Sequence, residues 1–323
     1  MKAASLLELD GDSIDRIIGL AESLIVSCYS DPWTIKDTPG LLGTLFHNIP
    51  PNEVRITRAA AHRLGLDLVD FGLHEEFTMN DEEILHEVSS ISSVADALVA
   101  GFVDLDTFGK GRELVEKVAG EVNIPFVSVG DDIYSNQSAL AELLAVKSQF
   151  GKLEGQKITV SWGFGTRFHL PTTAHSLMLL GAAMGAHVTI AAPPKFQLLR
   201  RVIKKAGELS KEANAELVEA KNFGEGLESP DVVYAMNWCR LDDFAHPERH
   251  AEAAAEFKDW VFTEDNLQSE TIFLTEPPAQ TDLIASPEVL KRAQNIATSW
   301  LARRVAVLSS CIIHSSENKL ALF

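Results

Sequence analysis

Residues 135–193 constrain the fold most, because their sequence pattern alternates between segments typical of helices and segments typical of strands. Apolar side chains recur with the 3.6-residue period through 135–150, which predicts an amphipathic helix. The uncharged run 158–162 is rich in β-forming residues, as is typical of a strand covered on both faces. A second helix is expected over 171–184 and a second strand over 188–190. Together these segments predict a βαβ unit, and therefore a parallel sheet.

The rest of the chain repeats this alternation. Upstream strands are expected at 43–46, 66–71, 97–103 and 125–129, between helices at 12–27, 50–64, 80–93 and 110–118. Downstream strands are expected at 157–162, 187–192, 215–219, 231–236 and 271–275, before one long final helix at 287–308. The predicted fold class is therefore α/β, with two doubly wound parallel-sheet domains, residues 1–150 and 151–286. In such sheets ligands bind beyond the carboxyl ends of the strands.

Charge and cysteine content exclude several classes of protein. The 323 residues carry a net charge of −18, so no nucleic-acid partner is expected, since such partners require a basic stripe. No apolar run approaches the length of a membrane span, and the first residues lack the apolar core of a secretory signal, so no membrane partner is expected. Cys28, Cys239 and Cys311 are odd in number and far apart, which favours a cytoplasmic location over a disulfide framework or a zinc site.

The segment after the strand at 157–162 predicts neither a cofactor nor a metal. Gly163 and Gly165 form a lone G-x-G, and the third glycine of a dinucleotide fingerprint is absent. His169 and His175 lie six residues apart, which does not place two metal ligands on one helix face. Arg167 and His175 are instead candidates for substrate binding, although a surface position for the arginine and a core position for the histidine are ordinary alternatives.

Several longer segments resemble the aspartate and ornithine carbamoyltransferases. The resemblance lies in ALAELLAVKSQFGKLEGQKITV at 139–160, SLMLLGAAMGAHVTIAAP at 176–193 and DVVYAMNW at 231–238, and in the order of elements along nearly the whole chain. It implies a first domain that binds carbamoyl phosphate and a second that binds an amino acid. It also implies a long helix within 287–323 that completes the first domain, and assembly as a homotrimer.

The motifs of that family's donor site are replaced here. The phosphate loop Ser-Thr-Arg-Thr-Arg falls on Pro-Pro-Asn-Glu-Val at 50–54, where Glu53 would repel a phosphate. The motif His-Pro-x-Gln falls on 135–138, the motif His-Cys-Leu-Pro on 275–278, and the arginine of the final helix near Ser299. One oxyanion donor is worth about 10²–10³ in rate, so loss of the whole set argues against ordinary transcarbamoylation.

Three residues are predicted to be catalytic: Arg55, Gln137 and Glu276. Arg55 lies one residue beyond the family's second phosphate-loop arginine, and a shifted register would return it to the site. Gln137 begins a helix, where polar side chains and backbone N–H groups suit a carbonyl or carboxylate. Glu276 replaces a cysteine that contacts the substrate amine, and it suits an amine partner or a general base. The alternative for Arg55 is a position on a solvated helix face, that for Gln137 is helix capping, and that for Glu276 is an ordinary charge in a loop.

The residues predicted to bind substrate are polar and flank the same loops: Asn52, Arg58, Ser135, Asn136, Arg167, His175, Asn237 and Arg240. Asn52 is equally suited to cap a helix, and Arg240 to clamp a carboxylate. Cys239 has no adjacent base in the sequence that would make it a nucleophile. Arg303 and Arg304 are expected on a solvated helix face.

These observations favour a divergent carbamoyltransferase-like enzyme that acts on a small amino acid or amine. Its remodelled donor site takes either a carbamoyl or acyl phosphate or a different donor. A catalytically silent paralogue that binds a small ligand or regulates a partner is the first alternative. An ornithine carbamoyltransferase whose phosphate site is rebuilt from Arg55, Arg58 and Arg167 is the second.

Overall fold

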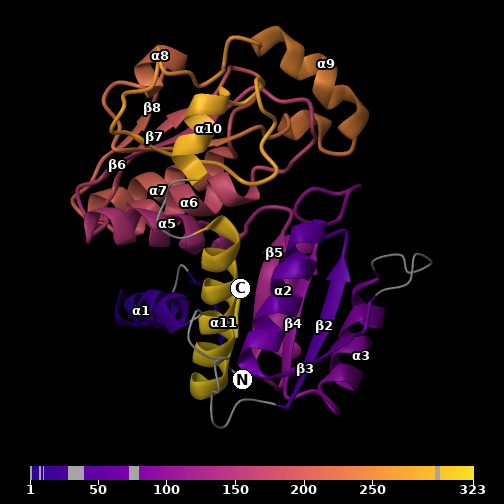
Figure 1. The fold of residues 1–323 in the computed structure, drawn as a ribbon. Helices are drawn as coiled ribbons and strands as arrows, with labels where there is room; N and C mark the ends of the chain where they lie inside the picture. Colours follow the sequence, from indigo (N-terminus) through magenta and orange to yellow (C-terminus); the bar gives the residue numbers. More distant parts are fainter. Residues whose placement is uncertain (1, 7–8, 10, 28–39, 73–79, 295–298) are drawn as a thin grey trace. The chain divides into compact units, whose positions relative to one another are not determined.

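The computed structural model describes residues 2–6, 9, 11–27, 40–72, 80–294 and 299–323. Internal contacts divide the chain into two units, each described here by itself (Figure 1). Unit 1 is Met1–Ala141 with Leu301–Phe323, and unit 2 is Glu142–Trp300. The division falls within helix α5 (Asn136–Phe150), ahead of the expected boundary after residue 150.

Unit 1 is built on a six-stranded sheet in the order β1-β11-β5-β4-β2-β3. Its strands are β1 (Lys2–Ala4), β2 (Leu41–His47), β3 (Asp67–Asp70), β4 (Ala97–Phe102), β5 (Phe126–Asp131) and β11 (Leu320–Leu322). Every pairing between these strands is parallel. The carboxyl ends of the central strands therefore meet at one edge of the sheet.

The helices of unit 1 cover this sheet. They are α1 (Gly11–Ser27), α2 (Pro51–Leu64), α3 (Asp81–Ile91), α4 (Lys110–Glu121), the first part of α5, and α11 (Trp300–Asn318). The apolar faces of α3 and α4 enclose a core with β4, in which Val88, Leu98 and Leu114 are buried. Helix α11 lies beside α1 (Figure 1), and Arg16 and Glu317 form an ion pair between them at 2.6 Å.

Local sequence signals fix the ends of these helices. Gly65 ends α2 in the left-handed conformation, with φ of 70°, and its N–H donates to the last carbonyls of the helix. The side chain of Asn80 accepts a hydrogen bond from the N–H of Glu82 and caps α3. Gly111 lets the start of α4 approach β4 closely, because a Cβ there would lie 2.3 Å from the carbonyl oxygen of Phe102.

Unit 2 contains a five-stranded parallel sheet in the order β10-β9-β6-β7-β8. Its strands are β6 (Lys157–Trp162), β7 (His187–Ala191), β8 (Leu217–Glu219), β9 (Val232–Met236) and β10 (Ile272–Leu274). Its helices are the rest of α5, α6 (Thr172–Ala183), α7 (Arg200–Glu212), α8 (Phe223–Gly226), α9 (His250–Ala254) and α10 (Pro287–Gln294). Trp162 and Trp238 are fully buried, and each indole N–H donates to a backbone carbonyl.

The α/β fold class with two parallel sheets is confirmed. Two strands of unit 1, the edge strand β1 and its neighbour β11, were not predicted, because a strand of three residues is too short to carry a periodic signal. The long final helix is confirmed as α11, which begins after the non-helical Ser299 and not at residue 287 as expected, and α10 is a separate helix before it. Residues 295–298 and Cys28 lie outside the described residues. Within the described part of the chain, no helix has both the length and the apolar character that crossing a membrane requires.

Candidate functional site

The start of α2 is the position where the sequence departs most from a phosphate loop. Its N-cap is Pro50, which offers no side-chain cap, and Pro51 follows in the first turn. Neither proline has a backbone N–H, and the N–H of Glu53 donates to the carbonyl of Pro50 at 2.9 Å. A helix start binds anions through its exposed N–H groups, so this one has lost most of that capacity. Asn52, expected to suit a cap, lies instead inside the first turn.

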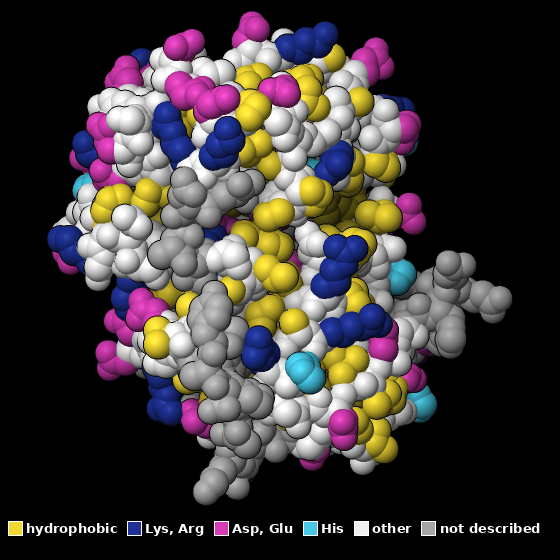
Figure 2. Space-filling view, in the orientation of Figure 1, with side chains coloured by type: hydrophobic (Ala, Val, Ile, Leu, Met, Phe, Trp, Pro, Cys, Tyr) yellow, Lys and Arg dark blue, Asp and Glu magenta, His cyan; other side chains and the backbone are white. Residues whose placement is uncertain are grey.

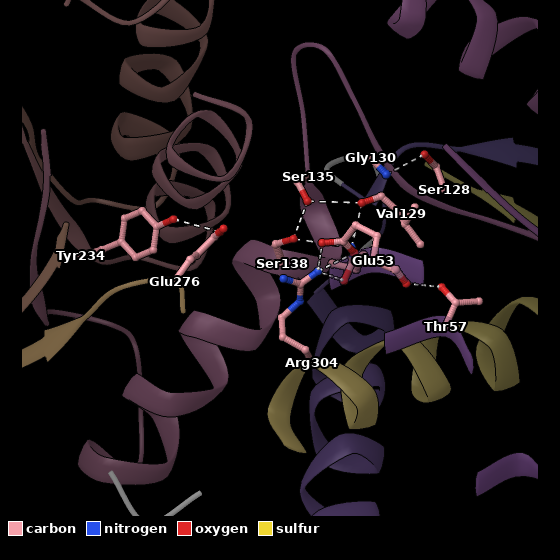
Figure 3. Close-up of polar contacts among 11 residues, drawn as sticks. Glu53, Thr57, Ser128, Val129, Gly130, Ser135, Ser138, Tyr234, Glu276 and Arg304 are labelled. Carbon is pink, nitrogen blue, oxygen red and sulfur yellow. Dashed lines mark hydrogen bonds and ion pairs between the residues drawn. The ribbon is translucent and has the colours of Figure 1, made fainter. Parts of the chain in front are cut away.

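A buried ion pair closes the same helix start (Figure 3). Arg304 of α11 directs Nη2 to both carboxylate oxygens of Glu53, at 2.7 Å each. Arg304 is 1 % exposed and Glu53 8 %. The side chain of Gln137 completes the cluster, since its Oε1 accepts from Arg304 at 3.2 Å and its Nε2 donates to Glu53 at 3.1 Å. The expectation of a solvated Arg304 is therefore wrong, and so is that of Arg303, which is buried and donates to the carbonyl of Ala141.

Three of the predicted residues lie at the start of α5: Ser135 directly before the helix, and Asn136 and Gln137 in its first turn. Gln137 Nε2 also donates to the carbonyl of Val129 at 2.7 Å, which ties the helix to the end of β5. Ser135 contacts the hydroxyl of Ser138 and the carbonyl of Val129. Asn136 differs from its neighbours, because it is only 6 % exposed and its Oδ1 accepts no hydrogen bond from the described residues.

Two carboxylates lie at the end of β5, Asp131 as its last residue and Asp132 directly after it, and both accept hydrogen bonds from backbone N–H groups of the protein. Asp131 accepts from the N–H groups of Ile133 and Tyr134 at 2.7 and 2.6 Å. Asp132 accepts from three N–H groups at the start of α4, those of the N-cap Gly109 and of Gly111 and Arg112, at 2.9 to 3.0 Å. Burial raises the pKa of Asp131 to about 6, and the guanidinium of Arg112, 3.4 Å away, opposes that shift. Arg112 also stacks over the rings of Tyr134 and Phe323.

Arg55 and Arg58 lie on the exposed face of α2 and do not join the buried cluster. Figure 2 shows basic side chains gathered over this helix. Arg55 contacts the side chain of Asn52 at 3.5 Å, so two predicted residues are neighbours. Both guanidinium groups are open to solvent, which fits the helix-face alternative.

In unit 2, Arg167, His169 and Asn237 lie together after β6 and β9. The amide of Asn237 donates to the carbonyl of Arg167 and lies 3.4 Å from Nε2 of His250. Nδ1 of His169 contacts the carbonyl of Asn237 at 3.3 Å. Desolvation of the buried His250 lowers its pKa to about 4, and the nearby His169 adds to the effect. The exposed guanidinium of Arg167 donates to the carbonyl of Pro278 at 3.2 Å.

Two further predicted residues of unit 2 are engaged by neighbours in their own loops. Arg240 forms an ion pair with the buried Asp243, whose other oxygen lies 3.9 Å from Arg249. The next residue back, Cys239, is fully buried, and burial raises the pKa of its thiol to about 12. A thiol in that state is not a nucleophile at neutral pH.

Glu276 is half-buried, and its Oε1 accepts a hydrogen bond at 3.1 Å from the hydroxyl of Tyr234 on β9 (Figure 3). Tyr234 is fully buried, and burial raises the pKa of its hydroxyl well above the usual value, with a further contribution from the carboxylates of Glu276 and Glu142. His175 is also fully buried, and its Nε2 accepts from the N–H of Leu199 at 3.1 Å. The roles proposed for these residues in catalysis and binding stay predictions.

Sequence reasoning missed Arg304, Asp131, Tyr234 and His250. Each is a polar residue whose partner lies far away in the chain or in a loop of irregular backbone, so no short-range pattern marks it. The alignment of Glu53 with the phosphate loop was the available signal for Arg304, because a buried carboxylate at a helix start requires a compensating cation.

Comparisons with known proteins agree with this architecture. The family model described as aspartate/ornithine carbamoyltransferase, Asp/Orn binding domain, matches residues 170–310. The catabolic ornithine carbamoyltransferase of Enterococcus faecalis is 28% identical over 175 residues, which is 54% of this chain and 50% of that protein. The corresponding enzyme of Staphylococcus aureus is 26% identical over 175 residues, which is 54% of this chain and 51% of that protein. The chain thus spans about half the length of the curated relatives it matches.

Solved structures cover more of the chain. The crystal structure of acetylornithine transcarbamylase complexed with acetylcitrulline superposes with a TM-score of 0.83 at 18% identity, over 98% of each chain. A crystal structure of N-acetyl-L-ornithine transcarbamylase superposes with a TM-score of 0.82 at 18% identity, over 98% of this chain and 99% of that one. At this identity the likeness establishes the fold.

Proposed function

Because the chain belongs to the aspartate/ornithine carbamoyltransferase superfamily, we propose that it is a divergent enzyme of that superfamily that acts on a small amino acid or amine. Its donor is not a carbamoyl phosphate held at the start of α2. The Glu53–Arg304 ion pair carries this proposal, because it places a carboxylate where the phosphate loop of the family is expected.

Charge and geometry at this position oppose a phosphate. A carbamoyl phosphate carries about two negative charges, and such an anion is bound by free N–H groups and by unpaired cations. Here Pro50 and Pro51 lack N–H groups, and Arg304 is already engaged by both oxygens of Glu53. Binding a phosphate would require the buried pair to break, which leaves a charge without its partner in the interior.

Features of unit 2 support an amino-acid substrate. An amino acid offers an anion and a cation, and unit 2 presents one group suited to each. The guanidinium of Arg167 is exposed and suits a carboxylate, while Glu276 suits an ammonium group or serves as a general base. Arg167 donates to the carbonyl of Pro278, two residues beyond Glu276, so both groups belong to neighbouring loops.

Specific contacts favour the alternative of a silent, ligand-binding paralogue. Arg240 is paired with Asp243, and Glu276 accepts from Tyr234, so two of the expected substrate contacts already have partners within the protein. An ornithine carbamoyltransferase with a rebuilt donor site requires Arg55, Arg58 and Arg167, and the exposure of all three side chains leaves that hypothesis open to test.

Thermal unfolding with ligands separates these functions. A ligand that binds only the folded protein stabilises it by about 2.7 kcal/mol at a hundred times its Kd, and so raises the melting temperature. We expect an amino acid such as ornithine to raise it and carbamoyl phosphate to leave it unchanged. Turnover of that amino acid with a donor other than carbamoyl phosphate supports the enzyme, whereas binding without turnover of any donor tried favours the silent paralogue. A shift with carbamoyl phosphate alone contradicts the proposal.

A further inference from the structure

Unit 2 contains a cavity at the amino ends of its strands, whereas Arg167 and Asn237 follow the carboxyl ends of β6 and β9. The cavity has a volume of about 320 Å³, and ligand pockets in proteins measure about 300–1,000 Å³. Residues of β6, β7, β8 and α8 line it, and these elements lie together in unit 2 (Figure 1). None of the residues predicted to be catalytic or to bind substrate is among them.

The topology of the sheet explains why this face is open. The chain passes from β6 to β7 to β8 in one direction across the sheet and then returns over β7 and β6 to β9. Right-handed crossovers place α6 and α7 on one face and the returning connection on the other. That connection contains only α8, a helix of four residues, against 12 in α6 and 13 in α7. So short a helix covers only part of the face.

Polar side chains form the floor of the cavity. Lys157 lies opposite His187, and Thr159 lies opposite Thr189, in the register of β6 and β7. Alternate residues of a strand share a face, and the hydroxyl of Thr159 donates to the carbonyl of Gly226 in α8, so this is the face that α8 covers in part. Strands of a parallel sheet with both faces covered are normally apolar. The polar floor therefore fits contact with water or with a polar ligand.

Three charged groups that line the cavity have no partner in the protein. The ammonium of Lys157 and the carboxylates of Glu216 and Glu228 form no ion pair and no hydrogen bond with the described residues. Glu219, on the same edge strand but outside the cavity, is paired with Arg200 at 2.6 Å. The cavity thus presents charges of both signs that are available to a ligand.

Two further side chains of the lining each keep a position for a ligand. His187 accepts a hydrogen bond at Nδ1 from the backbone N–H of Glu216, at 3.2 Å. A backbone N–H can only donate, so the neutral ring carries its proton on Nε2, which is a donor. Glu225 accepts from the N–H of Lys221 with Oε2, at 3.0 Å, and its Oε1 receives no hydrogen bond from the described residues.

The charges around the cavity favour a ligand with one anionic group and more than one cationic group. Lys157 and His187 are neighbours in the register and suit a carboxylate. The carboxylates of Glu216, Glu225 and Glu228 outnumber these donors and suit ammonium groups. Within the described part of the chain, no three His, Cys, Asp or Glu side chains are placed to hold a metal ion. An organic ligand with its charges spread along a chain therefore fits better than a metal ion.

We propose that this cavity binds an amino acid with a cationic side chain. Lys157 and His187 hold its carboxylate, and the three glutamates hold its ammonium groups. The ligand is an effector and not the substrate, because none of the predicted catalytic residues lines the cavity. The site is distinct from the amino-acid position of the proposed function, which lies at the other ends of the same strands.

Calorimetric titration of the full chain with three related probes tests this proposal. L-Lysine carries a carboxylate and two ammonium groups, L-norleucine lacks the side-chain ammonium, and cadaverine lacks the carboxylate. The first variant is Glu216→Gln with Glu228→Gln, at two exposed positions of the lining. Its matched control is Glu212→Gln with Glu252→Gln, which removes the same charge at two exposed positions outside the cavity.

We expect lysine to bind the wild type about tenfold more tightly than norleucine or cadaverine, because each of these lacks one charged contact. The first variant should weaken lysine binding by about tenfold, and the matched control should leave it unchanged. A second variant, Lys157→Met, should weaken lysine binding and strengthen cadaverine binding, because cadaverine then no longer faces a like charge. A loss of local structure would weaken both.

Equal binding of the three probes overturns the proposal, as does lysine binding that the first variant leaves unchanged, or no binding of lysine. Arg167→Ala separates this site from the proposed function. If Arg167→Ala abolishes lysine binding and the first variant does not, this proposal is removed and the proposed function is supported. If lysine binding survives Arg167→Ala and is weakened in the first variant, the effector site is supported, whatever becomes of the amino-acid position after β6.

Discussion

Arg304 reaches both carboxylate oxygens of Glu53 at 2.7 Å, although 251 residues separate the two in the chain. The pair joins the start of α2 to the first turns of α11, so it closes unit 1 across its two sequence segments. The carboxylate of Glu53 also occupies the cation that a bound phosphate would otherwise need. The stability of unit 1 and the charge of the ligand that it can bind therefore depend on the same two side chains.

Removing one partner of this pair should be costly. Glu53→Leu leaves the guanidinium of Arg304 buried without its carboxylate, and we expect it to lower the free energy of unfolding by about 3–5 kcal/mol. The double variant Glu53→Leu with Arg304→Met should recover much of the loss, because no uncompensated charge remains. Urea unfolding measures both. The control is Arg16→Met, which breaks an exposed ion pair and should cost about 1 kcal/mol or less. A double variant less stable than Glu53→Leu would contradict this account.

Arg55 and Arg58 should contribute little to stability. Both are exposed, so Arg55→Ala and Arg58→Ala should each change the free energy of unfolding by no more than about 0.5 kcal/mol. The same variants test the rebuilt phosphate site. If carbamoyl phosphate stabilises the wild type and either variant abolishes that effect, the two arginines form a phosphate site and our proposal is wrong.

Tyr234→Phe removes a single hydrogen bond to Glu276. We expect a loss of about 0.5–1.5 kcal/mol in the free energy of unfolding, since both groups lie in unit 2 and Glu276 keeps access to water. The substitution also frees the carboxylate to turn, so binding of an amine should weaken. Titration of ornithine into the variant and the wild type checks the second expectation, and equal affinities would show that Tyr234 does not position Glu276.

His250 should make unit 2 sensitive to acid. The pKa of His250 is about 4 in the folded protein, against an ordinary value of 6.5 that applies to the unfolded chain. Between pH 4 and 6.5 the unfolded chain therefore binds a proton at this histidine that the folded protein does not bind. The stability linked to this group is complete above pH 6.5 and is lost as the pH falls toward 4, by up to roughly 3 kcal/mol at about 1.4 kcal/mol per pKa unit. His250→Phe should remove this dependence, and His86→Gln, at an exposed histidine, should not.

Cys239 should be inert in the folded protein. Burial raises the pKa of its thiol to about 12, so almost no thiolate forms near neutral pH. Alkylation with iodoacetamide followed by peptide mapping should leave Cys239 and the equally buried Cys311 unmodified in native protein and modify both in urea. Rapid native labelling of Cys239 would reinstate it as a candidate nucleophile.

The fold followed from local signals that the sequence displays. Apolar periodicity placed α5 and β6, Gly65 placed the end of α2, and Asn80 placed the start of α3. Tertiary contacts decided what those signals could not. Arg304 has the local sequence of a solvated helix face, and only its distant partner Glu53 explains its burial. Ser299 interrupts the expected final helix without any glycine or proline to announce the break.

The candidate site was harder to predict for the same reason. The positions near Gln137 and Asn237 were predicted because ligands bind at loops that follow parallel strands. The loops hold carboxylates as well, and the sequence does not reveal that Asp131 and Asp132 accept hydrogen bonds from backbone groups around them. The irregular backbone of a loop decides whether its carboxylate points toward a ligand or toward groups of the protein. Such backbone has no periodic sequence pattern, so this direction cannot be predicted from the sequence.

The place of β11 between β1 and β5 bears on how the protein is made. A ribosome releases unit 2, which is continuous in sequence, before it releases residues 320–322. Until then one edge of β5 has no partner strand and the sheet of unit 1 is incomplete, whereas unit 2 already has every residue that it needs to fold. Newly synthesised chains should pass through a stage in which only the second unit is protected from proteases, and the first 141 residues then depend on the last strand for their protection.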